Sequence, residues 1–139
     1  MTKRFTLGKN ERLKSRKQIE QLFSMGKSFV VTPLRVHFVM NGEGSTEDKI
    51  NGLQFGVGVS NKNFKRSVDR NRIKRLIREA WRLQKGNLYQ LTKAFKKQLN
   101  VFIIYTGKDI PDFHLVKDKV EVILQKLSKL INENIAANS

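Results

Sequence analysis

Residues 53–82 read LQFGVGVSNKNFKRSVDRNRIKRLIREAWR, and this stretch contains the pattern that decides the fold. Over residues 53–59, apolar side chains alternate with glutamine or glycine, which predicts a strand whose second face is almost bare of side chains. From Ser67 onward, apolar residues recur at every third or fourth position, the spacing of a helix with one buried stripe. A strand, a polar connection and an amphipathic helix are therefore predicted to follow one another directly.

Three further elements are predicted before this unit. Ser15 and Gln18 fit a capping box at the start of a helix, and Gly26 ends that helix where a residue in the left-handed conformation is expected. Residues 28–31 and 34–40 predict two strands, the second with clear alternation of apolar and polar side chains.

Three more elements are predicted after it. Residues 87–98 have the spacing of a short helix, and residues 101–105 form a continuous apolar strand of the kind that is covered on both faces. Asp112 is placed to cap a final amphipathic helix. The order αβββααβα, without internal repeats, predicts a single α+β domain over residues 1–139.

Charge is the dominant feature of the composition. The 139 residues include 28 Lys and Arg against 12 Asp and Glu, a formal net charge of +16. The surplus lies in two blocks, because residues 1–40 carry +7 and residues 61–99 carry +11, whereas residues 100–139 are neutral. This distribution predicts a basic face for a polyanion, with nucleic acid the commonest candidate. The alternative is a basic surface that serves solubility alone.

The composition also argues against several classes of protein. The chain has no Cys, and therefore no disulfide, thiol nucleophile or thiolate metal site. No apolar run approaches the roughly 20 residues of a membrane span, and the residues after Met1 lack the apolar core of a secretory signal. We therefore expect a cytoplasmic protein with no membrane partner. Residues 41–52 are polar and acidic, which predicts an exposed loop that avoids polyanions.

The cations of residues 70–82 gather on one side of the predicted helix. At 100° per residue, four of them fall within about 100° of one another and away from the apolar stripe: Lys74, Arg75, Arg78 and Arg82. Asp69 and Glu79 are the only acidic residues nearby. An ordinary solvated helix face mixes its signs, so this face is predicted to hold phosphate groups. Lys62, Lys65 and Arg66 add charge just before the first turn, where backbone N–H groups also attract anions.

Catalytic groups are few in this sequence. The two histidines, His37 and His114, have no carboxylate pair at a recognisable spacing, and phosphate-binding glycine motifs and metal-ligand clusters are absent. His37 is interpreted as a surface or groove contact, and His114 as a solvent-facing helix residue. Trp81 is predicted to lie in the core. The helical spacing of Phe23 favours a core position, with base stacking as the alternative.

Residues 56–80 closely resemble the signature of the protein subunit of bacterial ribonuclease P, with Arg70-Asn71-Arg72 at its centre. Arg12-Leu13-Lys14 and the apolar strand before the last helix are also similar to that family. The resemblance implies a small sandwich with one mixed sheet and a left-handed βαβ crossover, opposite to the general preference. It further implies that a catalytic RNA removes the 5′ leader of precursor tRNA, with Mg²⁺ held mainly by RNA and no cofactor on protein side chains. No obligate protein partner is expected.

The resemblance implies roles for particular residues. The basic helix would contact the catalytic RNA or nearby substrate through Arg70, Asn71, Arg72, Lys74, Arg75 and Arg78, and the position of Lys62, Lys65 and Arg66 extends this set. The single-stranded leader would lie in a cleft lined by Phe23, Ile19, Arg35 and His37. The resemblance therefore favours the groove position of Phe23, and it assigns the protein no catalytic residue and no metal ligand.

Three positions depart from the family pattern. Asn61 stands where a lysine is usual, Ile19 where many members have an aromatic residue, and His37 where tyrosine is common. The acidic loop at residues 41–52 is longer than usual. A different class also fits the composition, namely a structural ribosomal or other RNA-binding protein that takes part in no reaction. A protein-only nuclease would need a carboxylate cluster that the sequence lacks.

Overall fold

The computed structural model describes residues 16–41, 53–94 and 98–138, and its elements follow the predicted order αβββααβα. They are α1 (Arg16–Met25), β1 (Lys27–Val31), β2 (Leu34–Asn41), β3 (Leu53–Val59), α2 (Ser67–Gln84), α3 (Gly86–Ala94), β4 (Gln98–Tyr105) and α4 (Phe113–Asn138). The predicted acidic loop lies outside the described residues, except that Asn41 is the last residue of β2.

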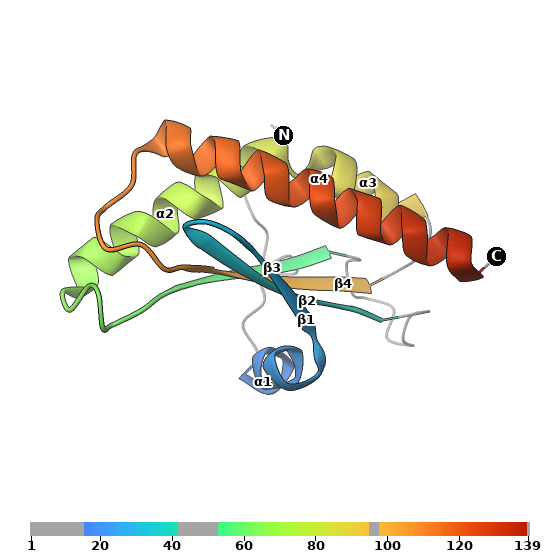
Figure 1. Ribbon diagram of the computed structural model, residues 1–139, viewed down its shortest axis with the longest axis horizontal. Helices are drawn as coiled ribbons and strands as arrows, with labels where there is room; N and C mark the ends of the chain where they lie inside the picture. The colour runs from blue at the N-terminus through green and yellow to red at the C-terminus, as the bar shows by residue number, and fades with distance from the viewer. Residues whose placement is uncertain (1–15, 42–52, 95–97, 139) are drawn as a thin grey trace, which may run out of the picture.

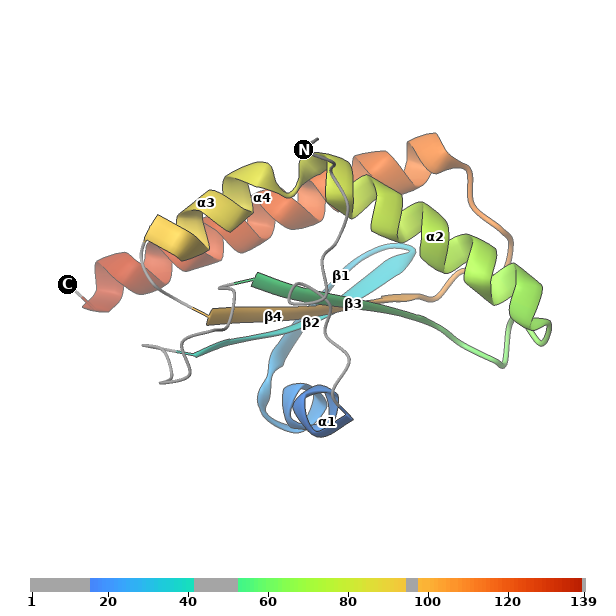
Figure 2. The same ribbon diagram turned by 180° about the vertical axis from the view of Figure 1, so that it is seen from behind.

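One four-stranded mixed sheet, in the order β1-β2-β4-β3, forms the middle layer. β4 pairs antiparallel with β2 and parallel with β3, while β1 pairs antiparallel with β2 at the edge. Helices α2, α3 and α4 lie on one side of the sheet and α1 lies alone on the other (Figure 1), and Figure 2 shows the same layers from behind. The α+β class is confirmed. The handedness of the crossover from β3 through α2 and α3 to β4 stays a prediction.

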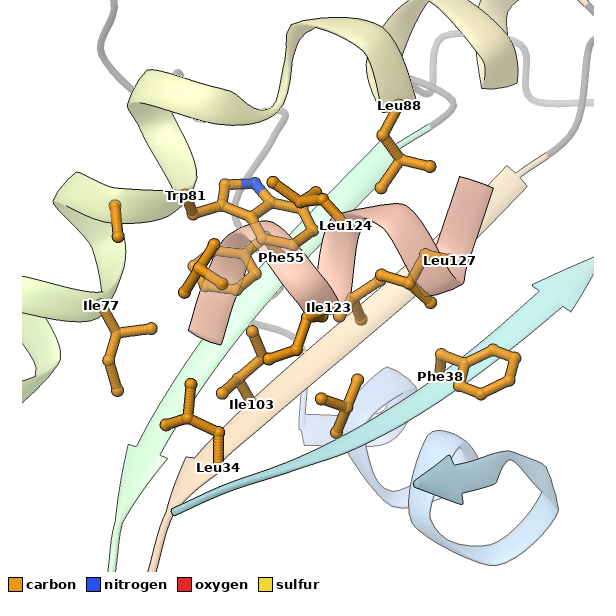
Figure 3. Close-up of a cluster of buried hydrophobic side chains, with 14 of the residues drawn as sticks. Leu34, Phe38, Phe55, Ile77, Trp81, Leu88, Ile103, Ile123, Leu124 and Leu127 are labelled. Atoms are coloured by element: carbon orange, nitrogen blue, oxygen red, sulfur yellow. The ribbon is translucent and has the colours of Figure 1, made fainter. Parts of the chain in front are cut away.

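The hydrophobic core fills the space between the sheet and the three helices (Figure 3). Trp81 of α2 is fully buried and stacks on Phe55 of β3, with ring centroids 4.2 Å apart and planes inclined by 7°. Ile123 and Leu127 of α4 are buried in the same cluster. The prediction that Trp81 belongs to the core is confirmed, and this packing fixes which side of α2 faces outward.

The boundary between α3 and β4 differs from the prediction. The predicted helix over residues 87–98 ends at Ala94, and Gln98 already pairs with Asn41 in the ladder between β4 and β2. Leu99 is buried, and it pairs with Leu53 of β3. The start of β4 is therefore set by pairing with strands on both sides and not by the local sequence pattern. The pattern does not reveal this pairing, because the partner strands are distant in the chain.

Gly26 ends α1 as predicted, but for a different reason. No glycine among the described residues has a positive φ, so the expected left-handed conformation is wrong. Instead, a Cβ atom at Gly26 would lie 2.5 Å from the backbone oxygen of Leu22 and 2.6 Å from that of Phe38. Glycine is therefore required by the close approach of the end of α1 to β2.

Candidate RNA-binding surfaces

The outward side of α2 carries the predicted cations. Its opposite side is fixed against the core by four buried residues, namely Ile73, Ile77, Ala80 and Trp81. With the helix held in this rotation, Arg75 and Arg78 are exposed and Lys74 is half-buried. Three of the four cations that were expected on one face therefore share one surface of the folded protein.

Arg82, the fourth cation of this face, has a partner on the same helix. Its guanidinium donates from Nε to the carboxylate of Glu79 over 3.1 Å, and its Nη2 forms an ion pair with the same carboxylate. The negative charge of Glu79 offsets the positive charge of Arg82, so Arg82 adds little to the net charge of this face. The surplus positive charge lies nearer the start of α2.

Arg70 anchors the residues that precede the helix. Its Nη1 donates hydrogen bonds to the backbone oxygens of Phe64, over 2.8 Å, and of Lys65, over 2.9 Å. Each of these oxygens therefore gains a charge-assisted bond, which holds the connection against the first turn of α2. Arg70 has a structural role that the sequence did not reveal, and its expected RNA contact would use the remaining guanidinium nitrogens.

The other predicted residues around the start of α2 lie at the surface. These exposed residues are Lys62, Lys65, Arg66, Asn71 and Arg72. Arg66 Nε lies 3.9 Å from the carboxylate of Asp69, and the Arg66 side chain is largely exposed, so this ion pair is weak. The start of α2 thus presents a group of cations to solvent beside the N-terminal end of a helix, an arrangement that attracts anions.

The connection between β3 and α2 is fixed to the end of β4. Phe64 is buried, and its ring centroid lies 6.0 Å from that of Tyr105. Asn63 Nδ2 also donates to the backbone oxygen of Gly107 over 3.2 Å. These contacts hold the backbone that carries Lys62 and Lys65 in a defined position beside the sheet.

The second candidate surface lies on the opposite side of the sheet, where α1 covers it only in part. Leu22 of α1 is fully buried and holds the helix against the sheet. Phe23, the next residue, is 45% exposed, with its ring centroid 4.8 Å from His37 and 5.5 Å from Phe102 in edge-to-face geometry. Phe23 is therefore partly exposed, and the core interpretation is wrong. The surface formed by Phe23, His37 and Phe102 is called the α1 groove below, after the cleft that the family resemblance implies.

The floor of this groove follows from the strand register. His37 of β2 pairs with Phe102 of β4, which pairs with Gly56 of β3. The next row across the sheet contains Arg35 of β2, beside Ile104 and Gly58 of the same neighbours. The bare strip predicted on β3 is real, and Phe102 leans over it, since a Cβ at Gly58 would lie 3.2 Å from the Phe102 ring.

The remaining groove residues have different exposures. Arg35 is exposed, while Ile19 and His37 are half-buried. Burial, and to a smaller extent the charge of Arg35, lowers the pKa of His37 below its usual value. The imidazole is therefore neutral at neutral pH, as suits a ring that packs edge-on against Phe23.

Phe102 is the groove residue that the sequence analysis missed. Residues 101–105 were interpreted as a strand covered on both faces, because every residue in that run is apolar or aromatic. In the structure, Val101, Ile103 and Tyr105 are buried on the side of α2 and α4, and Phe102 alternates with them toward α1. The period of two along the strand was the available signal.

The described residues contain no cluster for metal-dependent chemistry on the protein itself. Within residues 16–41, 53–94 and 98–138, no three His, Asp or Glu side chains come together as ligands. His114 is exposed, as expected, and its ring lies near that of Phe113. None of the helices in these ranges is long and apolar enough to cross a membrane.

Known proteins with the same features were found by sequence and by structure. A family model described as Ribonuclease P matches residues 7–128. The ribonuclease P protein component of Porphyromonas gingivalis strain W83 is 35% identical over 124 residues, covering 89% of this chain and 88% of its own. That of Idiomarina loihiensis is 38% identical over 129 residues, covering 93% of both chains. The solved RNase P protein from Thermotoga maritima has a TM-score of 0.61 at 26% identity, over 84% of this chain and 96% of that one.

The α+β fold and the exposed cations at α2 are those of a small basic RNA-binding protein. The family match narrows this class: the chain belongs to the ribonuclease P protein family. It is an RNA-binding protein subunit of a ribonucleoprotein endoribonuclease, and it assists removal of the 5′ leader from precursor tRNA. The alternative of an RNA-binding protein outside any catalytic assembly is therefore wrong.

Proposed function

We propose that the two surfaces divide the RNA between them, with the α2 face on the catalytic RNA and the α1 groove on the 5′ leader. The observation that carries this proposal is Phe23, whose half-exposed ring is held edge-on by His37 and Phe102. A buried ring would serve packing alone, whereas this one presents an aromatic surface to solvent at a defined position. Such a ring suits an unpaired base, which stacks without regard to sequence.

The groove combines the two features that single-stranded RNA requires. Phe23 and Phe102 supply aromatic surface, and the exposed cation of Arg35 lies one row further along the sheet floor. Gly56 and Gly58 add no side chains on the β3 side, and the Phe102 ring occupies the space over Gly58, so the aromatic surface of Phe102 extends toward β3. Leader recognition by stacking and charge, independent of sequence, follows from this composition.

The α2 face suits a structured RNA backbone. Lys74, Arg75 and Arg78 project from one rigid helix that the core holds in a fixed rotation. Cations at fixed spacing neutralise phosphates and release counterions, which gives affinity without reading base identity. The exposed Lys62 and Lys65 continue this surface toward the groove, because the connection that carries them leads directly from β3 to α2.

The chemical step is assigned to the RNA. Mg²⁺ bound mainly to RNA would activate the water that cleaves the leader. The protein would contribute position and charge: its cations hold phosphates of both RNAs, and Phe23 holds the leader near the scissile bond. The expected cytoplasmic location is part of this proposal.

Reconstitution with the cognate catalytic RNA tests the proposal. At low magnesium, the full chain should raise the rate of leader cleavage, and Phe23→Ala should lower affinity for precursor tRNA while leaving affinity for mature tRNA unchanged. The Val122→Ala variant is a suitable control, since Val122 is similarly exposed on α4, on the other side of the sheet. Cleavage that is unaffected by the protein would contradict the assignment, and equal losses for both tRNAs would remove the leader from the groove.

A further inference from the structure

An aromatic pocket lies between β1 and the C-terminal half of α4. Its volume is about 410 Å³, within the range of small-molecule sites. The pocket is lined by two aromatic rings, three lysines and one carboxylate, which belong to Phe29, Phe38, Lys27, Lys126, Lys129 and Glu133. None of these side chains belongs to the α2 face or to the α1 groove.

The strand register separates this pocket from the α1 groove. Lys27 pairs with Phe38, and Phe29 pairs with Val36, whose side chain is fully buried on the helix-covered side of the sheet. Phe29, Phe38 and Lys27 therefore point toward α4, on the side away from α1. Figure 3 shows Phe38 at one end of the core cluster, beyond Leu127 and far from Trp81.

The two rings give the pocket an aromatic wall. Phe29 and Phe38 have centroids 5.8 Å apart, with planes tilted by 58°. Phe38 is buried and Phe29 is half-buried, so both rings are supported by the core while Phe29 keeps accessible surface. Lys126 Nζ lies over the Phe29 ring, 5.2 Å from its centroid, so this flexible side chain would move aside for a base that stacks on the same ring.

Folding brings together a surplus of positive charge at this pocket, and this surplus is not evident from the charge of any one segment. Residues 100–139 are neutral in total, so α4 alone gives no sign of an anion site. The pocket, however, joins Lys126 and Lys129 of α4 with Lys27 from the basic N-terminal block, against the single carboxylate of Glu133. Three ammonium groups against one carboxylate, beside aromatic rings, match a ligand that is both anionic and flat.

We propose that this pocket binds one unpaired nucleotide of a bound RNA, with its base on the Phe29 ring and its phosphate among the three lysines. Stacking on an aromatic ring together with a nearby cation is the usual way proteins hold single-stranded RNA. Glu133 accepts hydrogen bonds only, so it favours a base that carries an exocyclic amino group. Adenine or cytosine is therefore expected to bind better than uracil.

The inference rests on the proposed RNA-binding function in one respect, namely that the ligand of the pocket is a nucleotide of RNA. The test itself needs no catalytic RNA. Full-length ¹⁵N-labelled protein is titrated with AMP, UMP, inorganic phosphate and a single-stranded adenosine heptamer, and amide shifts are followed by NMR. The test variants are Phe29→Leu, which keeps apolar packing, and Lys126→Ala combined with Lys129→Ala. The control is Lys119→Ala, which removes a charge from the same helix outside the pocket.

AMP and the heptamer should shift the amides of residues 27–29 and 126–130, and UMP should bind more weakly. Both test variants should lose roughly fivefold or more in affinity, the lower end of what one stacked base contributes, and the control should not. Shifts confined to the α1 groove, equal shifts with phosphate alone, or binding of AMP without binding of the heptamer would each overturn the proposal. If the nucleotides do not bind this pocket, the protein should still stimulate leader cleavage. If the protein does not stimulate leader cleavage, AMP and the heptamer should still shift the amides around the pocket.

Discussion

Replacing Phe23 with Ala should separate leader binding from folding. The ring is 45% exposed, and it contacts His37 and Phe102 edge-on. A fully buried Phe→Ala change costs ~3–5 kcal/mol, so roughly half of that, about 2 kcal/mol, is expected in the free energy of unfolding. If one leader base stacks on this ring, its loss should cost ~1–3 kcal/mol of binding, or roughly 5-fold to 150-fold in affinity.

The assay compares two substrates on the reconstituted holoenzyme at fixed salt. Fluorescence anisotropy gives Kd for precursor tRNA with a leader of several nucleotides and for the same tRNA without a leader. Phe23→Ala should raise only the first Kd, while urea unfolding measures the cost in stability. Leu22→Ala is the matched control on the same helix, because Leu22 is fully buried and its loss should cost ~2–5 kcal/mol of stability. In folded protein, the control should retain the preference for the leader.

Two results would refute the reasoning about Phe23. If Phe23→Ala keeps the wild-type ratio of the two Kd values, the exposed ring does not stack on a leader base. If Leu22→Ala removes the preference as completely as Phe23→Ala does under conditions where both proteins are folded, the groove acts through the placement of α1 and not through the ring. If a leader base stacks on the ring, Phe23→Tyr, which keeps an aromatic face, should preserve the preference for precursor tRNA over tRNA without a leader.

Lys74→Ala should lower the slope of log affinity against log salt by about 0.7–0.9, whereas Lys119→Ala on α4 should not, and equal slopes would remove the α2 face from the interface. Burial and a neighbouring arginine lower the pKa of His37 below 6.5, so protonation favours the unfolded chain. Thermal stability should therefore fall as pH drops from about 7 to 5, and the His37→Gln variant should show a smaller fall. An equal fall in the variant and the wild type would contradict a role of His37 in this pH dependence. Gly26→Ala should cost about 1–3 kcal/mol in urea unfolding, because its Cβ would meet two backbone oxygens, whereas Gly86→Ala, with nothing within 4 Å, should not destabilise.

The sequence predicts the elements whose signals are local. Alternation along β2 and β3 and the apolar stripe of α2 each depend on residues within one element, and the structure confirms their positions. The surface exposure of Arg75 and Arg78 follows equally, since burying one side of a helix necessarily turns the other outward. The position of the basic helix face is therefore predictable from residue spacing alone.

The features that the sequence does not predict depend on contacts between distant elements. Glycine is required at position 26 partly because the backbone of Phe38, on β2, lies so close to the end of α1. The start of β4 is set by its pairing with β2 and β3, and Phe102 becomes a groove residue only because α1 leaves that side of the sheet partly open. Local periodicity contains none of this information, because it describes one segment without its neighbours.

The Arg70-Asn71-Arg72 sequence shows why a family signature does not assign one role to all its members. Asn71 and Arg72 are exposed and available to RNA, whereas Arg70 already donates two hydrogen bonds to the backbone of the preceding connection. That connection contains Lys62 and Lys65 and joins β3 to α2. Loss of Arg70 would therefore act on RNA binding partly through the position of other cations. The signature therefore combines exposed residues with Arg70, whose hydrogen bonds fix the connection between β3 and α2.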